Sequence, residues 1–141
     1  MDNQNAMNKI GDYINRKYTE SLYIAGRVKF AQEEECVDLL TATADRGCNA
    51  ARMYIGIWYD RFVSSMLNEV NPDVELLHAA GAKAVDAFES YLFSYKAKEA
   101  KSDEFETAHI RVSFYYEIGL GVAKNTAKAL EHKRNAEKLN Q

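Results

Sequence analysis

The segment Tyr115–Leu139, "YYEIGLGVAKNTAKALEHKRNAEKL", decides the fold. It places a G-x-G pair, Gly119 and Gly121, between two stretches with helical spacing. A G-x-G-x-x-G phosphate loop follows a strand and needs a third glycine, and a P-loop needs G-K-[ST]; the segment meets neither requirement. We therefore interpret the pair as a turn, in which Gly119 ends the first helix with φ > 0. Asn125 or Thr126 then caps the second helix.

Small and apolar residues recur three and four positions apart in three parts of the chain. Such spacing puts them on one face of a helix, and similar copies within one chain indicate internal repeats. Few helix breakers interrupt these stretches, because the chain has one proline and seven glycines. The residues that share this face in the three copies are Ala51, Ile55, Tyr59 and Phe62; Ala108, Val112, Tyr116 and Gly119; and Tyr23 and Gly26.

The last copy resembles a Sel-one-like repeat, a relative of the tetratricopeptide repeat. The pattern of that repeat is roughly A-x-x-x-L-G-x-x-Y-x-x-G-x-G-V-x-x-[DN]-x-x-K-A. Ser113 replaces a glycine of the pattern, and His132 falls where the family favours Trp. The middle copy fits in its first helix and the first copy in its second half, where Gly47 precedes Ala51 by four residues. The positions of the last copy that fit are Ala108, Val112, Tyr116, Gly119, Gly121, Val122, Asn125, Lys128, Ala129 and Ala136.

The resemblance implies an all-α fold, an antiparallel helix-pair solenoid of about six to eight helices. We expect one α-helical repeat domain over residues 1–141, with repeat-like units at about 15–50, 51–83 and 108–141 and a degenerate unit at 84–107. One helical face of the degenerate unit carries Ala84, Phe88, Leu92 and Tyr95.

Charge and hydropathy narrow the class of protein. The net charge of −3 argues against nucleic-acid binding, which usually needs a basic excess. The first residues lack the basic and apolar regions of a signal peptide. No apolar run approaches the roughly 20 residues that span a bilayer. We therefore expect a cytoplasmic protein without a membrane partner.

No pattern in the sequence predicts a catalytic, cofactor or metal site. The histidines His78, His109 and His132 lack metal-ligand spacing, and no Ser, Thr or Cys lies in a nucleophile-elbow motif. Cys36 and Cys48 stand twelve apart without a nearby His. We interpret them as small buried residues in a reducing compartment rather than as a disulfide or metal pair. The sequence therefore predicts that the protein is not an enzyme.

Two charged clusters each allow two interpretations. The acidic "EEECVD" at 33–38 is either a docking patch or the start of a helix, where carboxylates face the positive end of the dipole. The basic "EHKRNAEK" at 131–138 either contacts RNA or supplies cations to a last helical turn. We favour the helix end in both cases.

A second stripe of large side chains is the candidate binding surface. Tyr54, Trp58 and Arg61 lie on a different helical face from the Ala51 stripe, and these residue types are enriched at interface hot spots. If the first helices line a concave side, as in tetratricopeptide relatives, this stripe faces a groove. Packing between neighbouring helices is the alternative for each residue. The equivalent positions in the last copy are Arg111, Tyr115 and Ile118. The predicted partner-binding residues are Tyr54, Trp58, Arg61, Arg111 and Tyr115.

These features predict a protein–protein interaction module that binds a protein partner through its concave face. The small size suggests an adaptor or a small neutralising protein, such as an immunity protein that sequesters a toxin. One alternative is a nucleic-acid-binding helical repeat, which salt-dependent binding would reveal. The other is an enzyme on an α-helical scaffold, which would need convergent titratable groups in a pocket.

Overall fold

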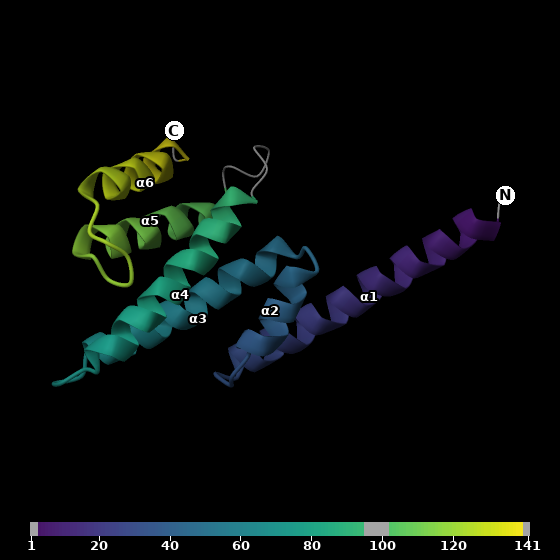
Figure 1. Cartoon of the computed structure of the whole chain (residues 1–141), viewed down its shortest axis with the longest axis horizontal. Helices are drawn as coiled ribbons and strands as arrows, with labels where there is room; N and C mark the ends of the chain where they lie inside the picture. Colours follow the sequence, from purple (N-terminus) through teal and green to yellow (C-terminus); the bar gives the residue numbers. More distant parts are fainter. Residues whose placement is uncertain (1–2, 95–101, 140–141) are drawn as a thin grey trace. The chain divides into compact units, whose positions relative to one another are not determined.

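The computed structural model describes residues 3–94 and 102–139, and in these ranges every regular element is an α-helix (Figure 1). This confirms the all-α prediction, and the six described helices match the expected number. Tyr95 falls outside the described residues. The helices are α1 (Asn3–Ala31), α2 (Val37–Asp45), α3 (Asn49–Leu67), α4 (Val74–Phe93), α5 (Asp103–Ile118) and α6 (Thr126–Lys138).

The chain groups into two compact units, Met1–Ala51 and Arg52–Gln141. The helix boundaries also differ from the predicted repeat boundaries. The predicted division between residues 83 and 84 lies inside α4, which runs unbroken from Val74 to Phe93. The helix starts before residue 84 because Asp73 caps it, which residue spacing alone did not indicate. The Asp73 carboxylate accepts a hydrogen bond from the Leu76 N–H at 3.1 Å.

In the first unit, α2 packs against the C-terminal part of α1 (Figure 1). Gly26 of α1 allows this approach, because a Cβ there would lie 2.7 Å from the Leu40 side chain. Gly26 holds the repeat position that corresponds to Gly119, but α1 continues past it to Ala31. Gly26 is therefore a close-packing glycine rather than a turn glycine.

The acidic cluster before α2 caps the helix. The Glu35 carboxylate accepts a hydrogen bond from the Val37 N–H at 2.6 Å, and Asp38 lies in the first turn. Both positions place negative charge at the positive end of the helix dipole. The helix-start interpretation is confirmed. Cys36 beside it is buried and Cys48 is half-buried, and both are free thiols.

In the second unit, α3 and α4 form a hairpin joined by close packing at Gly56. A Cβ on Gly56 would lie 2.6 Å from the Phe88 ring, so only glycine fits there. The predicted core stripe of α3 is wrong in part: Ala51 is buried, but Ile55 and Tyr59 are only half-buried and Phe62 is 41% exposed. The spacing of apolar side chains could not reveal that the Gly56 face of α3 is buried, because glycine has no side chain to contribute to that pattern. The buried residues on that face are Met53, Gly56, Val63 and Met66.

The α5–α6 hairpin follows the prediction closely. Ala108, Val112 and Tyr116 are all buried, which confirms the core stripe. Gly119 has φ 70° and ψ 45°, the left-handed conformation expected at the end of a helix. The Asn125 side chain accepts a hydrogen bond from the Lys128 N–H at 3.0 Å, so Asn125 rather than Thr126 is the cap.

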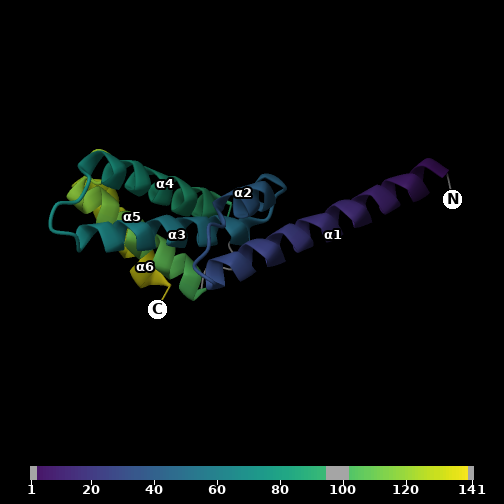
Figure 2. The ribbon, with the colours of Figure 1, turned by 90° about the horizontal axis from the view of Figure 1, so that it is seen from below.

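The turn between α5 and α6 is anchored on α4, and α5 lies between α4 and α6 in Figures 1 and 2. The Gly121 N–H donates to His78 Nδ1 at 3.0 Å. A Cβ on Gly121 would lie 2.1 Å from the Ala82 backbone nitrogen, and its φ of 77° also favours glycine. The G-x-G pair therefore serves the turn and the packing of that turn on α4.

Candidate functional site

The predicted binding stripe of α3 lies next to an open apolar groove. Trp58 lines this groove, whose volume is about 340 Å³, between α3 and α4. Tyr54 is half-buried and Arg61 is exposed, and neither lines the groove. The lining residues are Trp58, Tyr59, Phe62, Leu76, Ala79, Ala80 and Lys83.

The chemistry of this α3–α4 groove is simple. Its walls are aromatic and aliphatic, and Phe62 and Leu76 are each more than 40% exposed. Lys83 is the only charged lining residue. The groove offers apolar contact area beside a single ammonium group, and it has no acid, base or nucleophile arranged for chemistry.

The predicted binding residues of α5, Arg111 and Tyr115, contact Asp60 of α3 rather than an open groove. The Arg111 guanidinium donates to both carboxylate oxygens of Asp60 on α3, at 2.9 and 2.8 Å. The Tyr115 hydroxyl donates to the same carboxylate at 2.6 Å, and Tyr115 is 0% exposed. Tyr115 has no surface with which to contact a partner, so we remove it from the binding set. For Arg111 and Tyr115 the packing alternative describes the structure, since both hold α5 against α3.

The electrostatics of this Asp60 cluster favour the paired state. Burial acts to lower the pKa of Arg111, but the hydrogen bond and charge of Asp60 raise it on balance. Burial and the hydrogen bond to Asp60 raise the pKa of Tyr115, so its hydroxyl stays a donor. The sequence did not indicate Asp60, because its partners lie 51 and 55 residues away on another helix.

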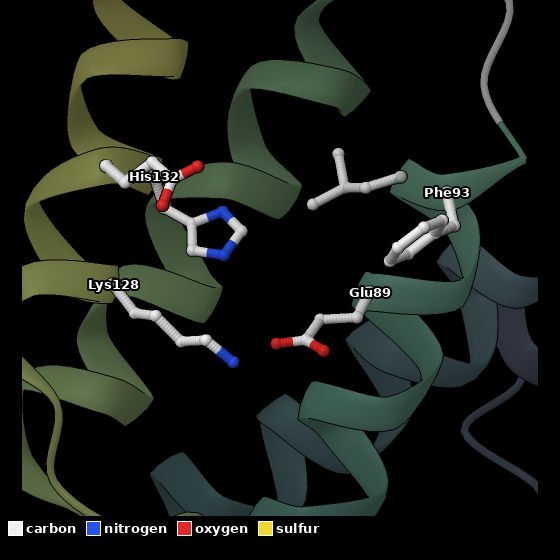
Figure 3. Close-up of a pocket in the computed structure, with 6 residues that line it drawn as sticks. Glu89, Phe93, Lys128 and His132 are labelled. Carbon is white, nitrogen blue, oxygen red and sulfur yellow. The ribbon is translucent and has the colours of Figure 1, made fainter.

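A second, polar pocket lies between α4 and α6 and holds about 500 Å³ (Figure 3). Figure 3 shows the Lys128 ammonium and the His132 imidazole directed from α6 toward the Glu89 carboxylate on α4. Phe93 forms an exposed apolar edge. The lining residues are Glu89, Leu92, Phe93, Lys128, Glu131 and His132.

Tyr116 of α5 joins this polar pocket to the core. Its hydroxyl donates to Glu89 Oε1 at 2.5 Å, and its ring stacks on His132 with centroids 6.1 Å apart. The Lys128 ammonium lies 5.0 Å from the centroid of the same ring. Burial and the hydrogen bond to Glu89 raise the pKa of Tyr116 to about 12. The tyrosine therefore stays neutral and leaves the second Glu89 oxygen to face the pocket.

Two histidines meet behind the polar pocket. His109 Nδ1 and His132 Nδ1 are 2.9 Å apart, so one of them donates its proton to the other. Burial, helped by the neighbouring His132, lowers the pKa of His109 to about 4. Burial also lowers the pKa of His132, although Glu89 and Glu131 act in the opposite direction. Both imidazoles are therefore neutral at pH 7, and a neutral imidazole can accept a proton.

Sequence reasoning missed the polar pocket because its lining residues come from α4 and α6, and the side chains behind it come from α5. His109 and His132 were judged too scattered to act together, but the antiparallel α5–α6 hairpin brings them into contact. One sign of this was present: His132 occupies the position where the repeat pattern favours a large aromatic ring, and it stacks on Tyr116.

Compared with protein-family models, curated proteins and solved structures, the chain matches none of them. Within residues 3–94 and 102–139, no helix combines the length and apolar composition needed to cross a membrane. The same residues contain no group of three or more His, Cys, Asp or Glu side chains arranged to hold a metal ion.

Proposed function

We propose that this chain is a protein-binding module that takes an amphipathic helix of a protein partner into the α3–α4 groove. The observation that carries the proposal is the groove itself, about 340 Å³ with Trp58 in its wall and exposed Phe62 and Leu76 beside it. Exposed aromatic and aliphatic side chains that gather in one concavity are typical of interaction sites.

The shape and charge of the groove favour a helical ligand. Two antiparallel helices leave a long trough between them, and an amphipathic helix fills such a trough with apolar residues at helical spacing. Lys83 adds one cation to an otherwise apolar lining. The partner helix therefore carries an acidic residue next to its apolar face.

The proposal includes a divergent Sel-one-like, tetratricopeptide-related arrangement with the groove on its concave side. Two observations support it. The helices follow one another as pairs, and the α5–α6 turn has glycines with positive φ at the two expected positions. Asp60 also joins α3 directly to α5, which is a contact between the first helices of successive pairs. Within this arrangement the protein acts as an adaptor or as a small neutralising, immunity-type protein.

The test uses capture followed by calorimetry. The wild-type chain captures a partner from a lysate of its source cells, the partner is identified by mass spectrometry, and purified proteins are titrated. Trp58→Ala should raise the Kd about 30- to 1,000-fold, the equivalent of roughly 2–4 kcal/mol. Phe93→Ala is the matched control, an exposed aromatic that lines the polar pocket instead. Equal binding by wild type and Trp58→Ala would contradict the proposal.

The polar pocket favours a second candidate, an enzyme or small-molecule receptor on the same scaffold. Glu89, His132 and Lys128 provide a carboxylate, a neutral base and an ammonium around one cavity, which suits proton transfer rather than covalent catalysis. The protein-binding function has more support, because the polar groups of this pocket already have partners within the protein. Tyr116 forms a hydrogen bond with Glu89, and His109 forms one with His132. Ligand-observed NMR with amino acids, carboxylates and nucleotides tests the pocket; binding that His132→Gln abolishes and His78→Gln preserves would favour the second candidate.

A further inference from the structure

The long helix α1 has one face that packs within its own unit. Gly26 and Phe30 on this face are buried, and Thr19 and Leu22 are half-buried. The Arg46 guanidinium at the end of α2 donates to Thr19 Oγ1 at 2.9 Å and to Asn15 Oδ1. The short α2, with nine residues, therefore occupies this face over the second half of α1.

The opposite face of α1 carries a regular apolar stripe. At about 100° per residue, the stripe lies on the other side of the helix from Leu22 and Gly26. Its positions alternate three and four apart over three heptads, and only Lys17 and Ser21 interrupt the apolar residues. The stripe residues are between 49% and 62% exposed. We call this set the heptad face: Met7, Ile10, Ile14, Ile24 and Val28.

The spacing and length of the heptad face identify what covers it. A repeat of 3.5 residues keeps a straight seam only against another helix that coils around it. The face spans 22 residues, roughly 33 Å at 1.5 Å per residue. α1 has 29 residues, and the other described helices have 20 or fewer. Within the part of the chain that the structure describes, only a second α1 matches this face along its whole length.

We propose that two copies of this chain pair through the heptad faces of their α1 helices. A two-fold pair uses the same patch twice, so Met7, Ile10, Ile14, Ile24 and Val28 supply both sides of the seam. The first half of α1 also needs such a partner, because an isolated helix of this length is marginal in water.

The polar interruption is compatible with pairing and limits its register. Lys17 has its own ion pair with Glu20, at 3.4 Å, and its alkyl stem can lie along the seam while the ammonium reaches water. One lysine in such a seam lowers stability but disfavours shifted registers, which would set it against isoleucine. The protein-binding groove on α3 and α4 shares no residue with the heptad face.

Sedimentation velocity of the full chain tests the pairing. At micromolar concentration the wild type should sediment at twice its 16.0 kDa mass, and the double variant Ile10→Glu, Ile14→Glu at 16.0 kDa. Ile110→Glu on α5 is the matched control, because Ile110 has similar exposure and lies outside the stripe; it should stay dimeric.

Lys17→Leu provides an independent readout that does not depend on breaking the helix. It leaves Ser21 as the one polar residue of the seam, so the dimer dissociation constant should fall at least about 10-fold. A wild type that is monomeric at 100 µM or above would overturn the proposal. So would a dimer that survives Ile10→Glu, Ile14→Glu, since it would use another face. Trp58→Ala should remain dimeric, which separates this proposal from the groove.

Discussion

Helices α3 and α5 carry the same predicted stripe but use it in opposite ways. On α3 the stripe position Trp58 lines an open groove, whereas the equivalent Tyr115 of α5 is completely buried. The difference comes from Asp60, whose carboxylate takes hydrogen bonds from Arg111 and Tyr115. A polar partner on the neighbouring helix converts a surface stripe into an interface within the fold.

The contrast between α3 and α5 indicates which of the two surfaces is available for binding. The polar groups that contact α5 pair with one another, as Tyr116 does with Glu89 and His109 with His132. These hydrogen bonds join α5 to α4 and to α6 within the second unit. Beside Trp58, the groove residues Phe62 and Leu76 are 41% and 48% exposed. The groove on α3 is therefore the better candidate for binding.

The largest expected effect comes from removing the Asp60 carboxylate, which joins α3 to α5. Asp60→Ala leaves the Arg111 guanidinium and the Tyr115 hydroxyl without their shared acceptor in a largely buried site. We expect a loss of about 3 kcal/mol in the free energy of unfolding, measured by urea denaturation. Asp86→Ala, at an exposed position of α4, should change it by less than about 0.5 kcal/mol. A loss below about 1 kcal/mol for Asp60→Ala would show that the cluster does not hold α5.

The second effect is a pH dependence of stability that arises mainly from His109 on α5. The folded protein holds His109 neutral down to about pH 4, whereas the unfolded chain takes up a proton near pH 6.5. Between these values the unfolded state binds more protons, so the free energy of unfolding falls as pH falls. The expected loss from pH 7.5 to pH 5 is about 2 kcal/mol, and it ends near pH 4.

Urea denaturation across pH checks this second prediction. The lowered pKa of His132 adds to the effect in the same direction, and Glu89, Glu131 and Lys128 are the charged groups around it. His109→Phe keeps an aromatic ring against Phe105 and removes the titration, so its stability should change less between pH 7.5 and 5. If the free energy of unfolding depends on pH equally in both proteins, His109 has the same pKa in the folded and unfolded states, which would contradict the prediction.

The sequence predicted those parts of the fold that depend on local spacing and on glycine. The Ala108–Tyr116 stripe, the Gly119 turn and the helical class all follow from residues close together in the chain. The buried face of α3 was missed because Gly56 packs by having no side chain. The Asp60 cluster was missed because it joins residues on different helices, and no local pattern records such a pair.

The third effect measures how exposed the α3 stripe is in the free protein. Trp58 is half-buried, so Trp58→Ala should cost about 1 kcal/mol in the free energy of unfolding, against roughly 3–5 kcal/mol for a core tryptophan. Because Trp58 is the only tryptophan, its fluorescence reports this site alone. Iodide should quench the emission of the wild type. Blue-shifted emission that resists iodide would place Trp58 in the core and remove the groove from consideration.

The smallest expected effect has the opposite sign and lies on the buried side of α5. Ser113 is 1% exposed, and its Oγ has no hydrogen-bond partner among the described residues. A buried hydroxyl without a partner costs free energy, and alanine is also the better helix former. Ser113→Ala should therefore raise the free energy of unfolding by about 0.5–1 kcal/mol. Ser64→Ala, at an exposed position of α3, measures the helix-propensity part alone and should give the smaller gain. If the two gains are equal, the Ser113 hydroxyl has a hydrogen-bond partner in solution and its burial costs no free energy.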